Sequence, residues 1–499
     1  MSDSVELRLD PAARGGTIPP ELYGHFAEHI GRGIYEGLWV GPESSIPNTR
    51  GLRNDVLEAL RQLDIPVLRW PGGCFADAYH WRDGIGPRDQ RPRRRDPIWG
   101  NVIETNAFGT HEFMDLVELL GCKAYVAANL GSGTVQEMSD WVEYLTGSAD
   151  STLVRERRAN GREQPWHIDY LGVGNENWVC GGNMRPEYYA DEFRRYNCFV
   201  RPPYLKPAIH RIACGPNEAD YRWTEVLMER AGTAMDGLSL HAYSLPTGDW
   251  KRKGPATGFD ENQWFSTLRA AVRMDELITR HSAIMDRTDP DRRVNLVVDE
   301  WGAWYDTEPG TNPRFLYQQN TLRDALVAAV TLHIFHQHAD RVRMANLAQT
   351  INVLQSLILT DGPRMLRTPT YHVFELFKCH QGAERLYVQL SAAPTYTYGA
   401  DTLPALSVAA TRAPDGTVNL TLANLDPHRD HPLSLRVPSN VAAADWRVLT
   451  AAAMDAHNTF DEPDRLVPAH LPAPAQEADV LQLNLPAKSV ARLSLSPVS

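Results

Sequence analysis

Two glutamates stand directly after short apolar runs, where a carboxyl group can serve as an acid, a base or a nucleophile. Glu176 follows Asn175 in YLGVGNENWVCGG, and Glu300 lies at the end of the run VNLVVDEWGAW. Cleavage of a glycosidic bond near neutral pH needs such a pair, because one carboxylic acid protonates the leaving oxygen while a carboxylate meets the oxocarbenium-like centre. A lone glutamate at such a position more often caps a helix or pairs with an arginine. The neighbouring amide and tryptophans favour the catalytic interpretation, since they suit the hydroxyls and C–H faces of a sugar.

The two glutamates belong to a series of eight short apolar runs that alternate with longer segments. The runs occupy residues 22–30, 66–73, 123–131, 168–177, 211–218, 237–244, 294–302 and 341–352. Most of the intervening segments carry apolar residues at three- and four-residue spacing and are predicted helices, among them 53–63, 111–120, 135–145, 186–200 and 313–338. Eight strands separated by helices close more naturally into a (β/α)₈ barrel than into an open doubly wound sheet, although the count alone allows both.

Chemically capable side chains recur at the C-terminal ends of these runs. They are His25, Glu28, Arg69, Cys74, Asn129, Asn175, Glu176, Asn217, Glu218, His241, Tyr243, Glu300, Asn346 and Gln349. Barrel enzymes assemble their active sites at this face, from several strands at once. The repeated bias therefore favours the barrel and predicts one shared site at its mouth.

The pattern of apolar and polar residues changes after about residue 385. Short alternating strands broken by Pro, Gly, Asn and Asp replace the strand-helix alternation, which predicts an all-β sandwich of the jelly-roll kind. The N-terminal VELRLD alternates in the same way and is expected to pair with that sandwich. The predicted organisation is an N-terminal strand within residues 1–18, a catalytic barrel over 19–384 and a β-sandwich domain over 385–499.

Composition and charge exclude several classes of protein. A formal net charge of −12 argues against a surface that neutralises nucleic-acid phosphates. The basic run RDQRPRRR at 88–95 contains an aspartate and a proline, is followed by Asp96, and is expected to be a solvated or ion-paired loop. A secretory signal and a membrane-spanning apolar stretch are both lacking in the sequence, so we expect a cytoplasmic enzyme without membrane contact.

Cysteines and histidines give no strong metal signal. The six cysteines lack paired CxxC spacing and, as normally reduced intracellular thiols, are mostly interpreted as buried small residues: Cys74, Cys122, Cys180, Cys198, Cys214 and Cys379. The HIFHQH cluster of His333, His336 and His338 is predicted to be a structural helix surface, because no carboxylate or thiol completes a ligand set. The GVGNEN run lacks the third glycine of a nucleotide-binding loop. We expect neither a metal nor an organic cofactor.

The longest motifs of the chain together resemble the α-L-arabinofuranosidases of glycoside hydrolase family 51. They are HFAEHIGRGIYEGLWV, VLRWPGGCFADAYHWRDGIGPR, FGTHEFMDLVELLG, YLGVGNENWVCGGNMRPEYYADEFRRY and VVDEWGAWY. The resemblance covers the barrel and the trailing β-domain. It implies an exo-acting enzyme that removes terminal arabinofuranose from arabinan, arabinoxylan fragments or arabino-oligosaccharides, with retention of configuration, and it implies a homo-oligomer such as a hexamer.

The resemblance also implies roles for individual residues. Glu176 matches the acid/base of the family and Glu300 its nucleophile, so their carboxyl groups should stand about 5–5.5 Å apart rather than the roughly 6.5 Å or more of an inverting pair. Glu28 matches a carboxylate that binds the furanose hydroxyls, and Asn175 matches an amide that binds the 2-hydroxyl. Cys74 lies beside the same subsite in this resemblance, although a simple packing role is an equal alternative.

Four further residues complete the expected site. Tyr243 and Gln349 match groups that orient the nucleophile and the sugar. Tyr243 shares a strand face with His241, which favours a common site over mere barrel lining. Trp99 and Trp178 resemble an aromatic pair at the entrance, and for Trp99 a surface position at a subunit contact is a comparable alternative.

Three other functions fit parts of the same pattern. A β-xylosidase or endo-β-glucanase could use the same framework, because the loops around the first subsite decide which sugar fits. A catalytically inactive sugar-binding protein would keep the aromatic and amide groups but lose the acid pair, whereas both glutamates are present here. The β-domain could be a carbohydrate-binding module, but it has few aromatic residues, so a packing or oligomerisation role is favoured.

Overall fold

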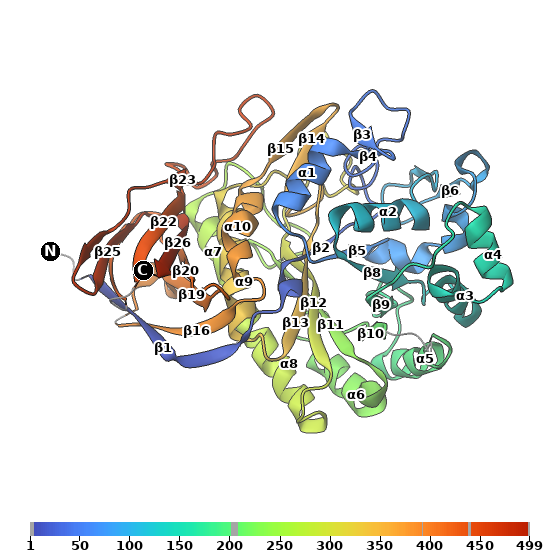
Figure 1. Ribbon diagram of the computed structural model, residues 1–499, viewed down its shortest axis with the longest axis horizontal. Helices are drawn as coiled ribbons and strands as arrows, with labels where there is room; N and C mark the ends of the chain where they lie inside the picture. Colours follow the sequence, from blue (N-terminus) through green and yellow to red (C-terminus); the bar gives the residue numbers. More distant parts are fainter. Residues whose placement is uncertain (1–3, 201–207, 392, 438–440, 498–499) are drawn as a thin grey trace.

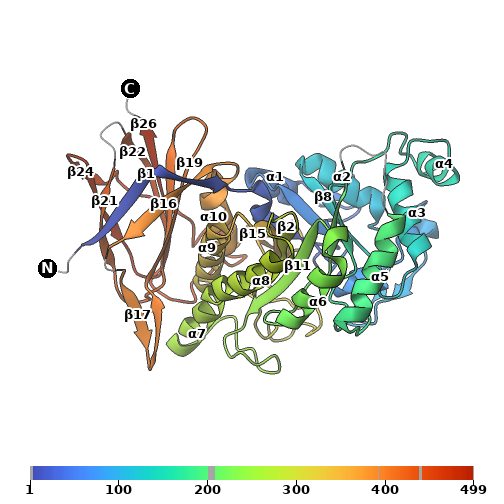
Figure 2. The ribbon, with the colours of Figure 1, turned by 90° about the horizontal axis from the view of Figure 1, so that it is seen from below.

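The chain folds into a helix-covered barrel with a β-domain at one end (Figure 1). The structure is a computed structural model that describes residues 4–200, 208–391, 393–437 and 441–497. The β-domain holds both ends of the chain, with the first strand in blue and the last strands in red lying together. A second view shows the same division, with α9 and α10 next to the β-domain and α3 to α6 at the far end of the barrel (Figure 2).

Eight parallel strands close the barrel, as the alternation of runs predicts. In ring order they are β10 (His210–Ala213), β11 (Gly237–Ser244), β12 (Asn295–Ala303), β13 (Val342–Ala348), β2 (Gly24–Phe26), β5 (Val67–Trp70), β8 (Lys123–Ala128) and β9 (Tyr170–Val173). Each lies within or at the edge of one of the eight predicted runs, and the predicted barrel class is confirmed. The buried apolar side chains of strands such as β5 and β12 explain why these runs read as continuous hydrophobic segments.

The helices surround the barrel near the positions that the periodicity predicts. They are α1 (Asn54–Gln62), α2 (Thr110–Leu120), α3 (Val135–Thr146), α4 (Thr152–Ala159), α5 (Pro186–Phe199), α6 (Tyr221–Ala231), α7 (Glu261–Val272), α8 (Met274–Thr288), α9 (Leu322–Gln337) and α10 (Pro369–Phe377). The segment predicted as a helix over 313–338 becomes helical only at Leu322, because Thr321 and Asp324 form a capping box there.

The β-domain is built on a ten-stranded sheet that includes the N-terminal strand. Its order is β23 (Ala469–His470), β22 (Val441–Leu449), β26 (Ser489–Pro497), β20 (Val418–Asn424), β19 (Leu406–Arg412), β16 (Glu384–Leu390), β1 (Val5–Thr17), β21 (His431–Arg436), β25 (Val480–Leu485) and β24 (Ala475–Glu477). Strand β1 pairs antiparallel with β16 and parallel with β21. Leucines from several of these strands form a second core, separate from that of the barrel.

Helix α9 is buried between the two parts rather than lying on the surface. His333 and His336 are both buried, so the prediction of a structural helix surface was wrong for this pair. The rings of His333 and His380 each bond to the Thr421 hydroxyl of the β-domain, at 2.9 and 2.8 Å, while His336 bonds to Tyr23. Burial lowers the pKa of all three imidazoles, to about 3 for His336, so they are neutral at the domain interface.

This buried histidine cluster should make the enzyme lose stability on acidification. Unfolded histidines take up protons near pH 6.5 while the folded ones stay neutral, so the unfolded state binds more protons between about pH 6.5 and 3. The free energy of unfolding should therefore fall by up to about 1.4 kcal/mol per pH unit for each histidine. Urea denaturation at several pH values between 7.5 and 5 gives the free energy of unfolding as a function of pH. This free energy should fall less steeply with decreasing pH for His336→Gln than for the wild type. His338→Gln, at the partly exposed C-cap of the same helix, is the control, and equal slopes for all three proteins would contradict this account.

Candidate active site

The polar residues at the strand ends converge at one mouth of the barrel. Strands β5, β11 and β12 carry Arg69, His241, Tyr243, Asp299 and Glu300, and the segments after β2, β5, β9 and β13 carry Glu28, Cys74, Asn175, Glu176 and Gln349. Hydrogen bonds join most of these side chains into three small groups, and ion pairs of His241 with Asp299 and Glu300 connect two of them. Of the other predicted strand-end residues, Asn129 bonds to Tyr79 and Ser132 and Glu218 pairs with Arg273, so neither joins these side chains.

The carboxyl groups of Glu176 and Glu300 are close neighbours. One oxygen of each, together with a ring nitrogen of His241, lies within 4.8 Å of the other two atoms. Retaining glycosidases hold their carboxyl groups about 5–5.5 Å apart, whereas inverting enzymes leave roughly 6.5 Å or more for a water molecule. The limit on the distance between these two oxygens lies below the separation that an inverting pair needs.

Glu300 is fixed by a donor on each carboxylate oxygen. Nη1 of Arg69 donates to Oε1 at 2.9 Å, and the hydroxyl of Tyr243 donates to Oε2 at 2.8 Å. Arg69 is fully enclosed and also contacts the carbonyl and the carboxylate of Asp299. A buried bidentate donor set of this kind holds a carboxylate in one orientation, as an attacking group requires.

Glu176 has a different environment, which suits a group that holds and releases a proton. Burial raises its pKa, although Nδ1–H of His241 donates to its Oε1 at 2.9 Å. The residue adopts a left-handed backbone conformation, with φ of 43°, directly after the turn at Gly174. Such a conformation is costly for a residue with a side chain and is typical of functional turns. The turn aims the carboxyl group back toward the barrel mouth.

His241 links the two glutamates to Asp299. Its Nε2 lies 3.2 Å from Asp299, whose other oxygen accepts the hydroxyl of Tyr125 at 2.7 Å. Burial disfavours the imidazolium ion, but the negative charges of Glu300, Asp299 and Glu176 outweigh burial and raise the pKa of His241 to about 10. A protonated ring at this position carries a proton on each nitrogen, with Nδ1 bonded to Glu176 and Nε2 ion-paired with Asp299.

A β-bulge explains why adjacent residues of β12 both reach the site. Side chains of successive strand residues normally point to opposite faces. Here Ser239 pairs with Val297 and His241 with Glu300, so three residue steps of β12 oppose two steps of β11. The extra residue turns the strand locally, and Asp299 joins the network beside Glu300. Strict alternation in the sequence does not predict a site role for Asp299.

Glu28 lies close to Glu300 and carries three hydrogen bonds. Its Oε1 accepts the indole N–H of Trp99 at 2.9 Å and the main-chain N–H of Phe75 at 3.1 Å, while Oε2 accepts from Gln349 at 2.8 Å. Burial, with the nearby charge of Glu300, raises the pKa of Glu28 to about 7. Trp99 thus belongs to the network of the site.

Asn175 and Gln349 present unused amide atoms. The side-chain oxygen of Asn175 accepts from Arg69 at 2.5 Å, and its buried Nδ2 has no hydrogen-bond partner among the residues that the structure describes. Oε1 of Gln349 is likewise buried and unpartnered within the described chain. Buried polar atoms are nearly always hydrogen-bonded, so these two atoms are the natural contacts for ligand hydroxyls.

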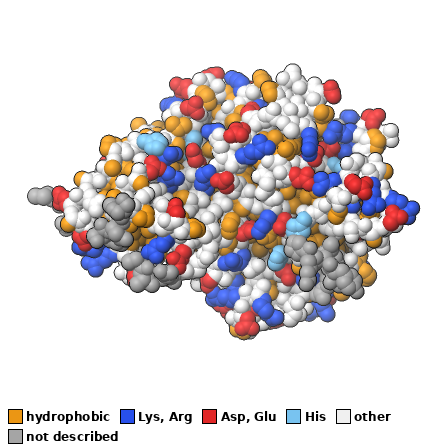
Figure 3. Space-filling model, viewed as in Figure 1, with side chains coloured by type: hydrophobic (Ala, Val, Ile, Leu, Met, Phe, Trp, Pro, Cys, Tyr) orange, Lys and Arg blue, Asp and Glu red, His pale blue; other side chains and the backbone are white. Residues whose placement is uncertain are grey.

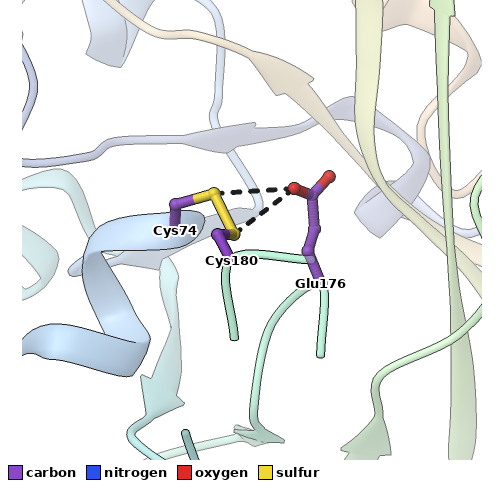
Figure 4. A group of neighbouring side chains, drawn as sticks. All are labelled: Cys74, Glu176 and Cys180. Atoms are coloured by element: carbon purple, nitrogen blue, oxygen red, sulfur yellow. Dashed lines mark hydrogen bonds between the residues drawn. A yellow bond between two sulfur atoms is a disulfide. The ribbon is translucent and has the colours of Figure 1, made fainter. Parts of the chain in front are cut away.

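Cys74 and Cys180 form a disulfide beside Glu176, which corrects the expectation of reduced, buried thiols (Figure 4). Both cysteines are partly exposed, and they join the loop after β5 to the loop after β9. Their separation of 106 residues offers no local motif from which to predict the pairing. The other four cysteines are free thiols: Cys122, Cys198, Cys214 and Cys379.

Aromatic residues line the approach to the acid pair. The indole N–H of Trp178 donates to the Gly215 carbonyl at 3.1 Å, which ties the loop after β9 to the end of β10. Trp304 packs edge-on against Tyr243, with ring centroids 4.9 Å apart, and Trp250 packs on Trp304 at 5.2 Å. Trp250 is 44% exposed. It lies in a loop without a repeating pattern, from which its position near Tyr243 could not be predicted.

The surface carries mixed charge, and the face in Figure 3 shows acidic and basic side chains interspersed. The basic run at 88–95 is ion-paired, because Arg88 and Arg91 bind Glu112 and Arg94 binds Asp83. Across the described residues, we find no helix with the length and apolarity needed to cross a bilayer.

Comparisons with known proteins match the chain along nearly its whole length. Residues 59–262 match the family model "Alpha-L-arabinofuranosidase 1 domain", and residues 299–489 match "Alpha-L-arabinofuranosidase C-terminal domain". An intracellular exo-α-L-arabinofuranosidase of Bacteroides ovatus is 47% identical over 479 residues, which are 96% of this chain and 93% of the relative.

Solved structures agree with the sequence relatives. A family 51 arabinofuranosidase from Xanthomonas axonopodis pv. citri superposes with a TM-score of 0.96 at 51% identity, covering 99% of this chain and 100% of the other. The arabinose complex of an α-L-arabinofuranosidase from Thermotoga maritima gives a TM-score of 0.88 at 29% identity, with the same coverage. A bifunctional glucanase-xylanase from a metagenome library is 13% identical with a TM-score of 0.64, a likeness of fold alone.

Proposed function

Because the chain belongs to the α-L-arabinofuranosidases of glycoside hydrolase family 51, we propose that its barrel-mouth site removes terminal arabinofuranose by a retaining double displacement. The activity is that of an exo-α-L-arabinofuranosidase. The observation that carries the mechanism is the close pair of Glu176 and Glu300 in unlike surroundings. Two carboxyl groups whose environments differ in this way divide into an acid and a nucleophile.

In the first step, Glu300 attacks the anomeric carbon while Glu176 gives its proton to the leaving oxygen. Arg69 and Tyr243 hold the two oxygens of Glu300 so that one can approach the carbon in line with the departing group. The product of this step is a β-linked arabinosyl-enzyme. In the second step Glu176, now ionised, takes a proton from water, and the water attacks to restore the α configuration.

Recognition of the furanose falls to the amides and the carboxyl group around Glu300. The free Nδ2 of Asn175 is suited to the 2-hydroxyl beside the reacting carbon. Glu28, with its pKa raised by burial to about 7, can both accept from and donate to sugar hydroxyls near neutral pH. Gln349 orients Glu28 and offers its own carbonyl oxygen. Trp99 and Trp178 form the apolar sides of the entrance, and the Cys74 disulfide borders the acid.

A panel of nitrophenyl glycosides tests the sugar preference. We expect kcat/KM on the α-L-arabinofuranoside to exceed that on the β-D-xyloside, β-D-glucoside and β-D-galactofuranoside by at least about 100-fold. A site built to bind particular hydroxyls leaves buried polar groups unpaired when it takes the wrong sugar. Comparable rates on the xyloside and the arabinofuranoside would instead favour the β-xylosidase alternative.

The natural substrates and surroundings belong to the same proposal. The Bacteroides ovatus relative is named intracellular, which supports a cytoplasmic location for this enzyme. In that location its substrates would be short arabino-oligosaccharides from arabinan or arabinoxylan. The net charge of −12 argues against nucleic-acid binding. The homo-oligomer, a hexamer by family resemblance, stays a prediction.

A further inference from the structure

One oxygen of Glu176 faces the disulfide between Cys74 and Cys180. Oε2 lies 3.6 Å from Sγ of Cys74 and 3.5 Å from Sγ of Cys180, within the range of hydrogen bonds to sulfur (Figure 4). A disulfide sulfur carries no hydrogen and cannot donate to the carboxyl group. Reduction would break the S–S bond, move the two sulfurs apart and leave S–H groups beside Oε2 that can donate to it. The oxidation state of this pair therefore decides whether Oε2 faces acceptors or donors.

The same oxygen must carry the catalytic proton. Oε1 of Glu176 already accepts Nδ1–H from His241 at 2.9 Å, and the cationic ring keeps that donor in place. The proton that goes to the leaving group is therefore held on Oε2, beside the two sulfurs. A neutral carboxyl group can rest against aprotic sulfur, whereas thiol donors stabilise an ionised carboxylate.

We propose that the Cys74–Cys180 disulfide is a positioning element that keeps Glu176 a competent acid, and that its reduction selectively weakens the protonation of poor leaving groups. The inference rests on the proposed assignment of Glu176 as the acid/base. It adds a dependence of that residue on thiol chemistry, which the proposed function does not require. Disulfides in reducing compartments are usually transient, catalytic or redox-sensing, so a cytoplasmic location is compatible with this role.

Reduction should act locally, because other contacts hold the two loops together. Asp77, three residues after Cys74, accepts the main-chain N–H groups of Leu130 and Gly131 at 2.7 and 2.6 Å through one oxygen. Its other oxygen accepts the main-chain N–H of Asn175 at 2.7 Å and the side chain of Asn177 at 3.3 Å. These bonds fix the turn that carries Glu176 whether or not the sulfurs are joined.

The redox step needs a dithiol reductant such as dithiothreitol. One of its thiolates attacks a sulfur of the pair, the S–S bond breaks, and a mixed disulfide forms. The second thiol of the reductant then displaces the remaining cysteine. Cys74 and Cys180 gain two electrons and two protons in total, and the reductant leaves as a cyclic disulfide. The partial exposure of both cysteines gives a small reductant access.

The test compares pH profiles of the oxidised and reduced enzyme on two leaving groups. Peptide mass mapping confirms the state of the pair in each sample. On α-1,5-arabinobiose, we expect reduction to move the alkaline limb of kcat/KM to lower pH, with a loss of about three- to tenfold at pH 8 and little change at pH 5. On a dinitrophenyl arabinofuranoside, which needs no protonation, kcat/KM should be the same in both states at both pH values.

Two double variants separate the loss of the cross-link from the gain of donors. Cys74→Ser/Cys180→Ser places hydroxyl donors beside Oε2. Its alkaline limb of kcat/KM should therefore lie at the same lowered pH as that of the reduced enzyme. Cys74→Ala/Cys180→Val fills the space with methyl groups that cannot donate, and it should keep the alkaline limb near that of the oxidised enzyme. Both variants lack the covalent link, so a purely structural role would affect them equally.

The outcomes distinguish this inference from the assignment of Glu176. If the limb position is the same in oxidised and reduced enzyme, or the two double variants coincide, the role of the disulfide is overturned while Glu176 remains the acid. If Glu176→Ala loses activity equally on arabinobiose and the dinitrophenyl substrate, the acid assignment itself fails. A shift on arabinobiose alone, shared by the serine variant and absent from the alanine/valine variant, supports the proposal.

Discussion

Glu300→Ala is expected to lower kcat/KM by at least about 10⁴-fold on every arabinofuranoside, whatever its leaving group. The covalent intermediate cannot form without the nucleophile, so a better leaving group gives no recovery. The substitution should leave the fold intact, because Arg69 keeps its contact with Asp299 and its buried charge is not left alone. Steady-state kinetics on a dinitrophenyl arabinofuranoside and on arabinobiose measure the effect.

The stereochemistry of azide rescue sharpens this prediction. Azide in the space left by Glu300 would attack the α-substrate once, from the side of the missing carboxylate, and give the β-azide. An α-azide from Glu300→Ala would contradict the assignment. Glu218→Ala is a control at another barrel-strand end, since Glu218, like Glu176, has a left-handed backbone after a barrel strand but pairs with Arg273 instead of a catalytic group. We expect it to retain kcat/KM within about threefold.

Glu176→Ala should separate substrates by their leaving groups. Loss of the acid should cost about 10²–10⁴-fold in kcat/KM on arabinobiose, whose alkoxide leaves only when protonated. Most of kcat/KM should survive on the dinitrophenyl substrate, while kcat falls because no base activates the water that hydrolyses the intermediate. The same comparison on wild-type enzyme is the reference.

Azide rescue also tests the role of Glu176, and the expected product is the anomer opposite to that from Glu300→Ala. It needs no deprotonation, so it should speed turnover of Glu176→Ala and attack the β-linked intermediate to give the α-azide. Finding the β-azide from this variant, or an equal loss on both substrates, would overturn the assignment of Glu176.

The elements and the acid pair could be predicted because they follow local rules. Apolar runs alternating with amphipathic segments specify the barrel, and the strand ends specify the face on which Glu176 and Glu300 meet. Tyr243 was predictable from its register with His241 on one strand. Its bond to Glu300 is a direct result of that register.

The features that escaped prediction depend on contacts that sequence spacing does not encode. Asp299 reaches the network only because β12 bulges, and a bulge cannot be read from alternation. Cys74 meets Cys180 through two different loops, and the expectation of a reducing compartment argued against their pairing. His333 shows helical spacing that fits a surface helix as well as a buried one. The β-domain that covers it comes from sequence far downstream.

The place of β1 in the sheet makes the barrel an insertion within a discontinuous domain. The first strand lies between β16 and β21, so its partners appear only after most of the chain has been made. During synthesis both edges of β1 stay unpaired until β16 and β21 have been made. Unpaired strand edges can associate with other chains. A circular permutant that links the end of β26 to β1 and opens the chain just before η1 (Pro20–Tyr23) would bring the whole β-domain into one continuous stretch. Its refolding yield, compared with that of the natural order, would measure how much this delayed pairing costs.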